Sequence, residues 1–128
     1  MRIKSVCVLI GAAALALPPT RAGAVTQDNF LARTTRDLVA LCSAASNDPM
    51  RDAAIHFCHG YVVGAFHYYK ATEASLGSAR IVCLPDPPPS REQGIQNFVV
   101  WASQNPQYMN EFPVDTVFRF AAMKWPCR

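Results

Sequence analysis

The stretch HFCHGYVVGAFHYY, residues 56–69, decides the fold, because it holds all three histidines of the chain and one of its five cysteines. On a helix, at about 100° per residue, the three histidines fall on one side and most apolar residues fall on the other. The stretch therefore predicts the middle of a long amphipathic helix with its histidines in solvent. The side predicted to be buried carries Ile55, Cys58, Tyr61, Val62, Ala65, Tyr68 and Tyr69.

The histidines suggest a metal site, but the helix geometry argues against one. His56 and His59 could share an ion across one turn, whereas Cys58 points away and His67 lies roughly 16 Å along the axis from His56. The pentapeptide IHFCH, residues 55–59, resembles the haem motif C-x-x-C-H without its first cysteine. We expect no metal and no cofactor. A haem-binding module, recognisable by a Soret band, is kept as a third alternative.

The apolar pattern outside this stretch predicts an all-α fold class: a small four-helix domain stapled by two disulfides. Apolar residues recur at helical spacing over residues 35–45, 49–75, 91–105 and 113–125. The first three predicted helices each begin at residues that can cap a helix. These are Thr34 or Thr35, Asp48 before Pro49, and Ser90 with Gln93. The segment CLPDPPPS, residues 83–90, is predicted to be a stiff, extended connection.

Gly60 and Gly64 lie four residues apart in the long helix, where each costs about 1 kcal/mol relative to alanine. With Ala53 and Ala71 they form a strip of small residues along one line of the helix. Such a strip lets another helix approach closely. We favour a helix of the same domain, and a homodimer is the second interpretation. Tyr61, between the two glycines, is predicted to belong to the core.

The first 24 residues have the features of a secretory signal peptide. Arg2 and Lys4 precede an apolar run at residues 6–17, and Ala22-Gly23-Ala24 has the small-x-small pattern of a cleavage site. We expect cleavage after about Ala24, export of the chain, and a single helical domain at residues 25–128. The apolar run is shorter than the roughly 20 residues that span a bilayer, so no membrane span is predicted.

The net charge of the domain differs from that of the whole chain. The chain carries 12 basic and 9 acidic residues, a formal charge of +3. Three of the basic residues, Arg2, Lys4 and Arg21, precede the predicted cleavage site, so residues 25–128 are formally neutral. A neutral domain has no electrostatic preference for nucleic acid, and no nucleic-acid partner is predicted.

Four cysteines, Cys42, Cys58, Cys83 and Cys127, lie within residues 25–128. An even number in a short exported domain predicts a disulfide framework. Four cysteines allow three pairings, and all three stay open at this point. Zinc binding is not favoured, because no two of these cysteines have the spacing of a zinc-binding pair.

The sequence lacks the common catalytic signatures. It contains no G-x-S-x-G, no H-E-x-x-H and no glycine-rich phosphate loop. The cysteines are predicted to be oxidised and the histidines exposed, so a Ser/His or Cys/His pair would lack an activated partner. We therefore expect a binding protein that is not an enzyme and has no catalytic residues.

Several segments carry a resemblance that covers nearly all of residues 25–128: LVALCS at 38–43, FCHGYVVGA at 57–65, VCLP at 82–85, NP at 105–106 and PVDTVFRFAAMKWPC at 113–127. The C-x-G-Y-x-x-G element and the final Pro-Cys pair are the most specific. Together the segments resemble the Rap/Tai family of type VI secretion immunity proteins. The resemblance implies a helical, disulfide-bonded periplasmic protein, often a homodimer, that binds a cognate peptidoglycan amidase effector. It further implies that the protein occludes the active site of this toxin without turnover.

The resemblance does not supply the toxin-contacting residues, so we predict these from the sequence. The Pro-rich residues Asp86, Pro87, Pro88 and Pro89, or the loop at residues 73–80, are long enough to project from a helical scaffold. Loops placed in this way commonly carry binding function. In this interpretation Gly60, Tyr61 and Gly64 serve packing and do not contact the toxin.

A periplasmic acid-stress or general chaperone is the alternative function. Histidines on an exposed helix face gain positive charge in acid, which would add repulsion across any dimer interface that they line. Acid-triggered dissociation with exposure of apolar surface would support the chaperone. A monomer–dimer ratio that stays unchanged between neutral and acid pH would count against it.

Overall fold

The computed structural model describes residues 23–76 and 79–127 and confirms the all-α class. In chain order its elements are the 3-10 helix η1 (Gln27–Leu31), α1 (Thr35–Cys42), α2 (Arg51–Leu76), α3 (Arg91–Gln104), the 3-10 helix η2 (Pro106–Tyr108) and α4 (Pro113–Lys124). No strand forms among the described residues, where an isolated bridge pairs Val82 with Pro126. Residues 1–22 of the predicted signal peptide lie outside this description.

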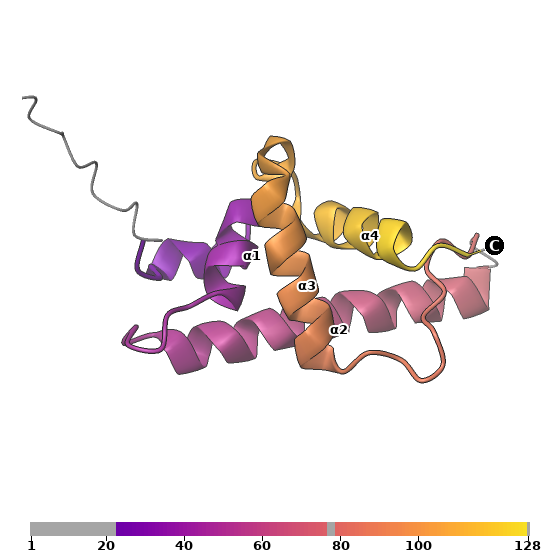
Figure 1. Cartoon of the computed structure of the whole chain (residues 1–128), viewed down its shortest axis with the longest axis horizontal. Helices are drawn as coiled ribbons and strands as arrows, with labels where there is room; N and C mark the ends of the chain where they lie inside the picture. Colours follow the sequence, from indigo (N-terminus) through magenta and orange to yellow (C-terminus); the bar gives the residue numbers. More distant parts are fainter. Residues whose placement is uncertain (1–22, 77–78, 128) are drawn as a thin grey trace, which may run out of the picture.

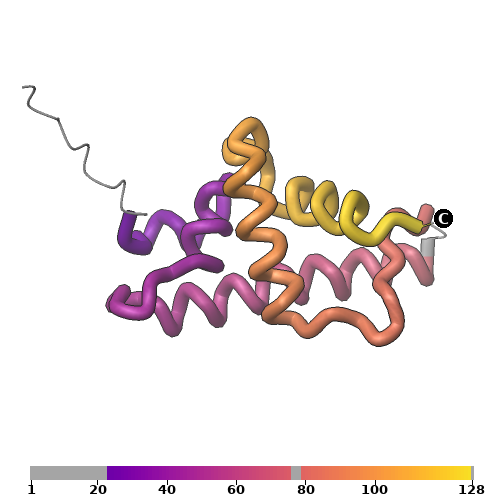
Figure 2. The backbone as a smooth tube through the Cα atoms, viewed as in Figure 1, coloured from indigo at the N-terminus to yellow at the C-terminus, as the bar shows by residue number. Residues whose placement is uncertain are grey.

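The long helix α2 runs along the longest axis of the molecule, and α3 crosses it near its middle (Figure 1). α1 lies toward one end of α2 and α4 toward the other, and α1 contacts all three of the other α-helices. Figure 2 shows how the chain returns from the C-terminal end of α2 to the start of α3. In residues 23–76 and 79–127, no helix has the length and apolarity needed to cross a membrane.

Reciprocal side-chain caps begin α1 and α3. At α1 the Thr34 N–H donates to an Asp37 carboxylate oxygen (3.0 Å), and the Asp37 N–H donates back to the Thr34 hydroxyl (3.4 Å). At α3 the Ser90 N–H donates to Gln93 Oε1 (3.0 Å), and the Gln93 N–H donates to Ser90 Oγ (3.2 Å). Each box satisfies N–H groups that the first helical turn leaves free. The predicted cap at Thr34 and the predicted Ser90–Gln93 box are confirmed.

Two helix boundaries differ from the prediction. α1 ends at Cys42 and not at residue 45, and the Ser43 hydroxyl donates to the Val39 carbonyl just beyond the end. α2 begins at Arg51 and not at Pro49, because the Asp48 carboxylate accepts the Met50 N–H (2.8 Å) and forms a turn first. Asp side chains offer the backbone such local alternatives to helix.

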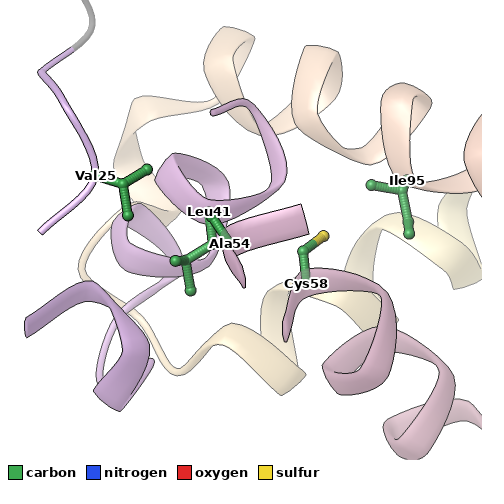
Figure 3. Packing of buried hydrophobic residues seen from close by; sticks show 5 residues of the cluster. All are labelled: Val25, Leu41, Ala54, Cys58 and Ile95. Atoms are coloured by element: carbon green, nitrogen blue, oxygen red, sulfur yellow. The ribbon is translucent and has the colours of Figure 1, made fainter. Parts of the chain in front are cut away.

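The core consists of two clusters of buried side chains. The first lies where the lead-in to η1 meets α1, α2 and α3 (Figure 3). Its members point toward one another and are Val25, Leu41, Ala54, Cys58 and Ile95. Cys58 is fully buried, so its predicted place on the buried side of α2 is confirmed.

The second cluster joins α1, α3 and α4 around Phe98 and Phe120. Its other buried members are Leu38, Ala102 and Val117. Beside it the buried hydroxyls of Thr35 and Thr116 lie 2.7 Å apart and link α1 to α4. Because buried polar groups are costly unless they are hydrogen-bonded, this pair also favours one relative placement of the two helices.

Two disulfides are present, and the structure selects one of the three pairings. Cys42 bonds to Cys58, with a Cα–Cα distance of 5.2 Å. Cys83 bonds to Cys127, with a Cα–Cα distance of 4.9 Å. Cys42 packs against both core clusters, so the first disulfide ties them to α2. The predicted disulfide framework is confirmed.

Candidate functional site

The Pro-rich segment, defined here as residues 84–90, is held at both of its ends. At its start the Cys83 N–H donates to the Trp125 carbonyl (2.8 Å), and the Cys83–Cys127 disulfide closes beside this bond. At its end Ser90 caps α3. Proline has a fixed φ and no N–H donor, so the backbone between these attachments has little freedom. The segment is therefore a rigid feature between two fixed points.

The four residues predicted to bind a partner lie on this segment. Asp86, Pro87 and Pro88 are exposed, and Pro89 is half-buried. The Asp86–Pro87 peptide bond is cis. Pro88 and Pro89 also form one wall of a cavity whose other walls come from α2, α3 and α4. The segment thus presents one side to solvent and the other to an apolar hollow.

The second predicted loop, residues 73–80, is wrong over its first four residues, because residues 73–76 form the end of α2. The Glu73 carboxylate lies 2.8 Å from Lys70 Nζ and 2.6 Å from Arg80 Nε. The hydrogen bond from Lys70, together with the charges of Lys70 and Arg80, lowers the pKa of Glu73 below its usual value. Just beyond this loop, the Tyr69 hydroxyl accepts the Ile81 N–H (2.9 Å).

Gly60 and Gly64 do not sit beneath another helix of the domain. Both are exposed, and a Cβ built on either would meet nothing within 4 Å. The favoured interpretation, close packing inside the domain, is therefore wrong for the described residues. Ala53 and Ala71 are exposed as well, so the whole strip of small residues lies on an open face of α2.

Tyr61 lies between the two glycines in sequence but on a different side of α2. It is half-buried, packs against the second core cluster, and stacks on Phe57 with ring centroids 6.2 Å apart. Burial raises the pKa of the Tyr61 hydroxyl, an effect that a backbone hydrogen bond at Val114 partly offsets. Tyr61 therefore contributes packing between α2 and α4.

The three histidines do not share one exposed face, contrary to the prediction. His56 is exposed, and its Nδ1 lies 2.7 Å from the Asp52 carbonyl oxygen. His59 is half-buried, with its Nε2 3.3 Å from a Glu92 carboxylate oxygen at the start of α3. His67 is exposed at the mouth of the cavity. The crossing of α3 over α2 separates them, because it covers the position of His59.

The predicted buried side of α2 is also partly wrong. The periodicity places Tyr68 toward the core, yet 73% of its surface is exposed. Phe66, which the periodicity leaves off that side, lines the cavity beside α3 and α4 together with Val62. The face of α2 that the other helices cover is therefore turned about the helix axis from the face that the periodicity predicts to be buried.

The pairing of Cys58 bears on the haem alternative. Its sulfur is bonded to Cys42, so it is not available for a thioether to haem. Within residues 23–76 and 79–127, no three His, Cys, Asp or Glu side chains are grouped so that they could hold a metal ion.

What the described residues do present is a rigid exposed segment, an apolar cavity behind it, and an open strip of small residues on α2. These three features are the candidate binding surfaces.

The structure also brings together residues that the sequence analysis did not single out as a pair. The Val25 N–H donates to Asp48 Oδ2 (2.8 Å), and the Val25 side chain is buried in the first cluster. Val25 is the residue directly after the predicted cleavage site. The sequence did offer one signal for the burial of Val25. The first residue of a mature chain has no general need to be apolar, and this one is a valine.

Comparison with known proteins gives one match. The family model described as Rap1a immunity proteins matches residues 34–127, from the cap of α1 to the last disulfide cysteine. Among curated proteins and among solved structures nothing matches. The matched region contains all four α-helices and both disulfides. The chain therefore belongs to the Rap1a immunity protein family.

Proposed function

We propose that this protein is a periplasmic immunity protein of a type VI secretion system that binds a peptidoglycan-cleaving amidase toxin and occludes its active site. The family match over residues 34–127 carries the proposal. Two disulfides in a small domain support an exported location, because such bonds persist in oxidising compartments. Inhibition of this kind requires burial of an interface and no turnover.

The Pro-rich segment is the surface that we propose for the toxin. Its exposed residues Asp86, Pro87 and Pro88 stand between a disulfide and a helix cap, so little conformational entropy is lost when they are bound. A rigid projection is suited to insertion into a concave active site. Because residues 25–128 are formally neutral, shape and apolar contact carry more of the recognition than net charge.

A capture experiment and a titration test the function. Oxidised protein purified from the periplasm is used as bait in periplasmic extract, and a cell-wall hydrolase is expected among the captured proteins. When that hydrolase digests purified peptidoglycan, its activity should fall linearly with added immunity protein and end near an equimolar ratio. A hydrolase that stays fully active in the presence of excess protein would refute the proposal. Many weakly held proteins, captured mainly after acid exposure, would favour the chaperone.

Replacing Pro87, Pro88 and Pro89 by serine is expected to weaken toxin binding by about tenfold or more. The loss combines removed apolar contact with the cost of ordering a segment that has become flexible, and about 1.4 kcal/mol corresponds to tenfold. Calorimetric titration of the captured toxin measures it. As a control, the exposed Pro49 and Pro106 are replaced by serine in a second variant, which should bind within about twofold of the wild type. Equal affinity of both variants would exclude the Pro-rich segment from the interface.

If the protein is exported, cleavage of its signal peptide should change the stability of the folded domain. We propose cleavage after Ala24, which would turn the Val25 amide into an ammonium group 2.8 Å from the Asp48 carboxylate. Hydrogen bonds between charged groups are stronger than neutral ones, so the processed chain should be about 1 kcal/mol more stable than a chain that retains Gly23 and Ala24. This difference corresponds to roughly 4–8 °C in Tm.

Thermal unfolding of both chain lengths measures the effect of processing. In an Asp48→Asn background the difference between the two lengths should disappear, and it should also disappear when alkaline pH removes the proton of the α-amine. A difference that stays the same size in the Asp48→Asn background would assign it to something other than this ion pair. Equal Tm values for the two wild-type lengths would contradict the prediction outright.

We also propose a homodimer through the strip of Ala53, Gly60, Gly64 and Ala71. Its support is the open face of α2, where a Cβ on either glycine meets nothing within 4 Å. Small residues at such positions let two backbones approach closely. Sedimentation equilibrium of the processed protein gives its mass directly, and a monomer at all concentrations would remove this proposal.

A further inference from the structure

An apolar cavity of about 340 Å³ lies between α2, α3, α4 and the Pro-rich segment. This volume lies within the range of pockets that hold small molecules, roughly 300–1,000 Å³. Val62, Val63 and Phe66 of α2 line it, and Phe98, Phe118 and Phe120 contribute from α3 and α4. Nothing in the proposed toxin contact requires a hollow of this kind.

The titratable groups that line the cavity are basic and solvent-exposed. Of the residues that line it, Arg91 and His67 carry the titratable side chains, both are exposed, and no Asp or Glu is among the lining residues. Within the described part of the chain Arg91 makes no ion pair. Glu92, the nearest acidic residue in sequence, contacts His59.

The start of α3 adds to the positive character of the mouth. Ser90, Arg91 and Gly94 of its first turn line the cavity. Helix N-termini attract negative charge through their free N–H groups and the helix dipole. A cavity with apolar walls, a helix N-terminus and a free arginine at its opening is complementary to a molecule with an apolar body and an anionic end.

We infer that this cavity binds an alkyl chain with a carboxylate or other anionic head group, the chain inside and the head group at Arg91. The source of such a chain is either a free fatty acid or the acyl tail of an anionic lipid. The inference does not depend on the toxin, because the lining residues belong to this chain alone.

Gly94 provides a substitution that fills the cavity without disturbing the fold. It lies in α3 and lines the cavity, and a Cβ at this position would meet nothing within 4 Å. Leucine there should extend into the hollow, and it has a higher helix propensity than glycine. Ser103→Leu is the matched control, because Ser103 also lies in α3, is exposed and does not line the cavity.

The experiment titrates decanoate into the processed protein and follows the tryptophan fluorescence, to which Trp125, at the cavity, and Trp101, outside it, both contribute. Saturable binding is expected for the wild type. Gly94→Leu should weaken it at least tenfold, whereas Ser103→Leu should stay within twofold. Arg91→Gln should weaken decanoate by roughly three- to tenfold and leave decanol unchanged, and Arg33→Gln, an exposed arginine outside the cavity, should alter neither.

Several outcomes would overturn the inference. They are the absence of saturable binding, equal binding by Gly94→Leu and Ser103→Leu, and decyltrimethylammonium binding as tightly as decanoate. Weaker toxin binding by Gly94→Leu in a protein that does not bind decanoate would assign the cavity to a toxin side chain and refute the small ligand. Where decanoate does bind, sedimentation with phosphatidylglycerol vesicles distinguishes the two sources, since a lipid tail requires retention on the vesicles and a free acid does not.

Discussion

Simultaneous replacement of Cys42 and Cys58 by alanine is expected to lower the free energy of unfolding by about 4 kcal/mol. The bond closes a loop with a sequence separation of 16, and loop closure of this length contributes about 3 kcal/mol in the chain-entropy description. The remainder is lost packing, because Cys58 is fully buried and Cys42 contacts both core clusters. Small domains have net stabilities of about 5–15 kcal/mol, so this loss is a large fraction of the total.

Urea unfolding of the oxidised protein, followed by far-UV circular dichroism, measures this loss. The companion variant replaces Cys83 and Cys127, whose sulfurs lie outside the two core clusters. This variant should lose the stability that closing the loop contributes, yet keep the near-UV circular dichroism signal of its packed aromatic side chains. The Cys42/Cys58 variant should weaken that signal too. A Cys42/Cys58 variant within about 1 kcal/mol of the wild type would show that the bond does not hold the core together.

Phe120→Ala is expected to cost about 3–5 kcal/mol, the usual range for a buried phenylalanine. Only 4% of Phe120 is exposed, and its ring centroid lies 5.9 Å from Phe98, 5.8 Å from Trp101 and 5.7 Å from Trp125. Truncation removes the member common to these three aromatic contacts and leaves a cavity that rigid neighbours cannot fill.

Phe112→Ala is the matched control for this substitution. Phe112 stands directly before α4 and is 70% exposed, so the same chemical change there should alter the free energy of unfolding by less than about 0.5 kcal/mol. Chemical unfolding of both variants under the same conditions gives the comparison. Similar costs for the two substitutions would mean that Phe120 is not a centre of the core.

Much of the fold was predictable because its signals are local. The boxes at Thr34 and Ser90 and the helical periodicity of residues 91–105 and 113–125 depend on residues within four positions of one another. A run of three prolines excludes helix by itself, which places the Pro-rich segment between α2 and α3. The exposure of Asp86, Pro87 and Pro88 follows from the same chemistry.

The errors in the candidate site share one cause. The angular pattern of α2 predicts that Tyr68 is buried and His59 exposed, and the strip of small residues predicts that Gly64 is covered. Tyr68 and Gly64 are instead exposed, and His59 is half-buried. A helical wheel shows how apolar each face of a single helix is. It gives no information about the direction from which the other helices approach. α3 crosses α2 over His59 and leaves the glycines open.

The sequence by itself determined the helical class, the starts of α1, α3 and α4, the four-cysteine framework and the family-like segments, because each rests on neighbouring residues or on residue type. Only the tertiary structure decided the pairing of Cys42 with Cys58, the contact of Val25 with Asp48, and the cavity behind the Pro-rich segment. These features join residues that are far apart in the chain. Their distances depend on how rigid helices are rotated and crossed, and those angles are set by side-chain packing across the whole domain.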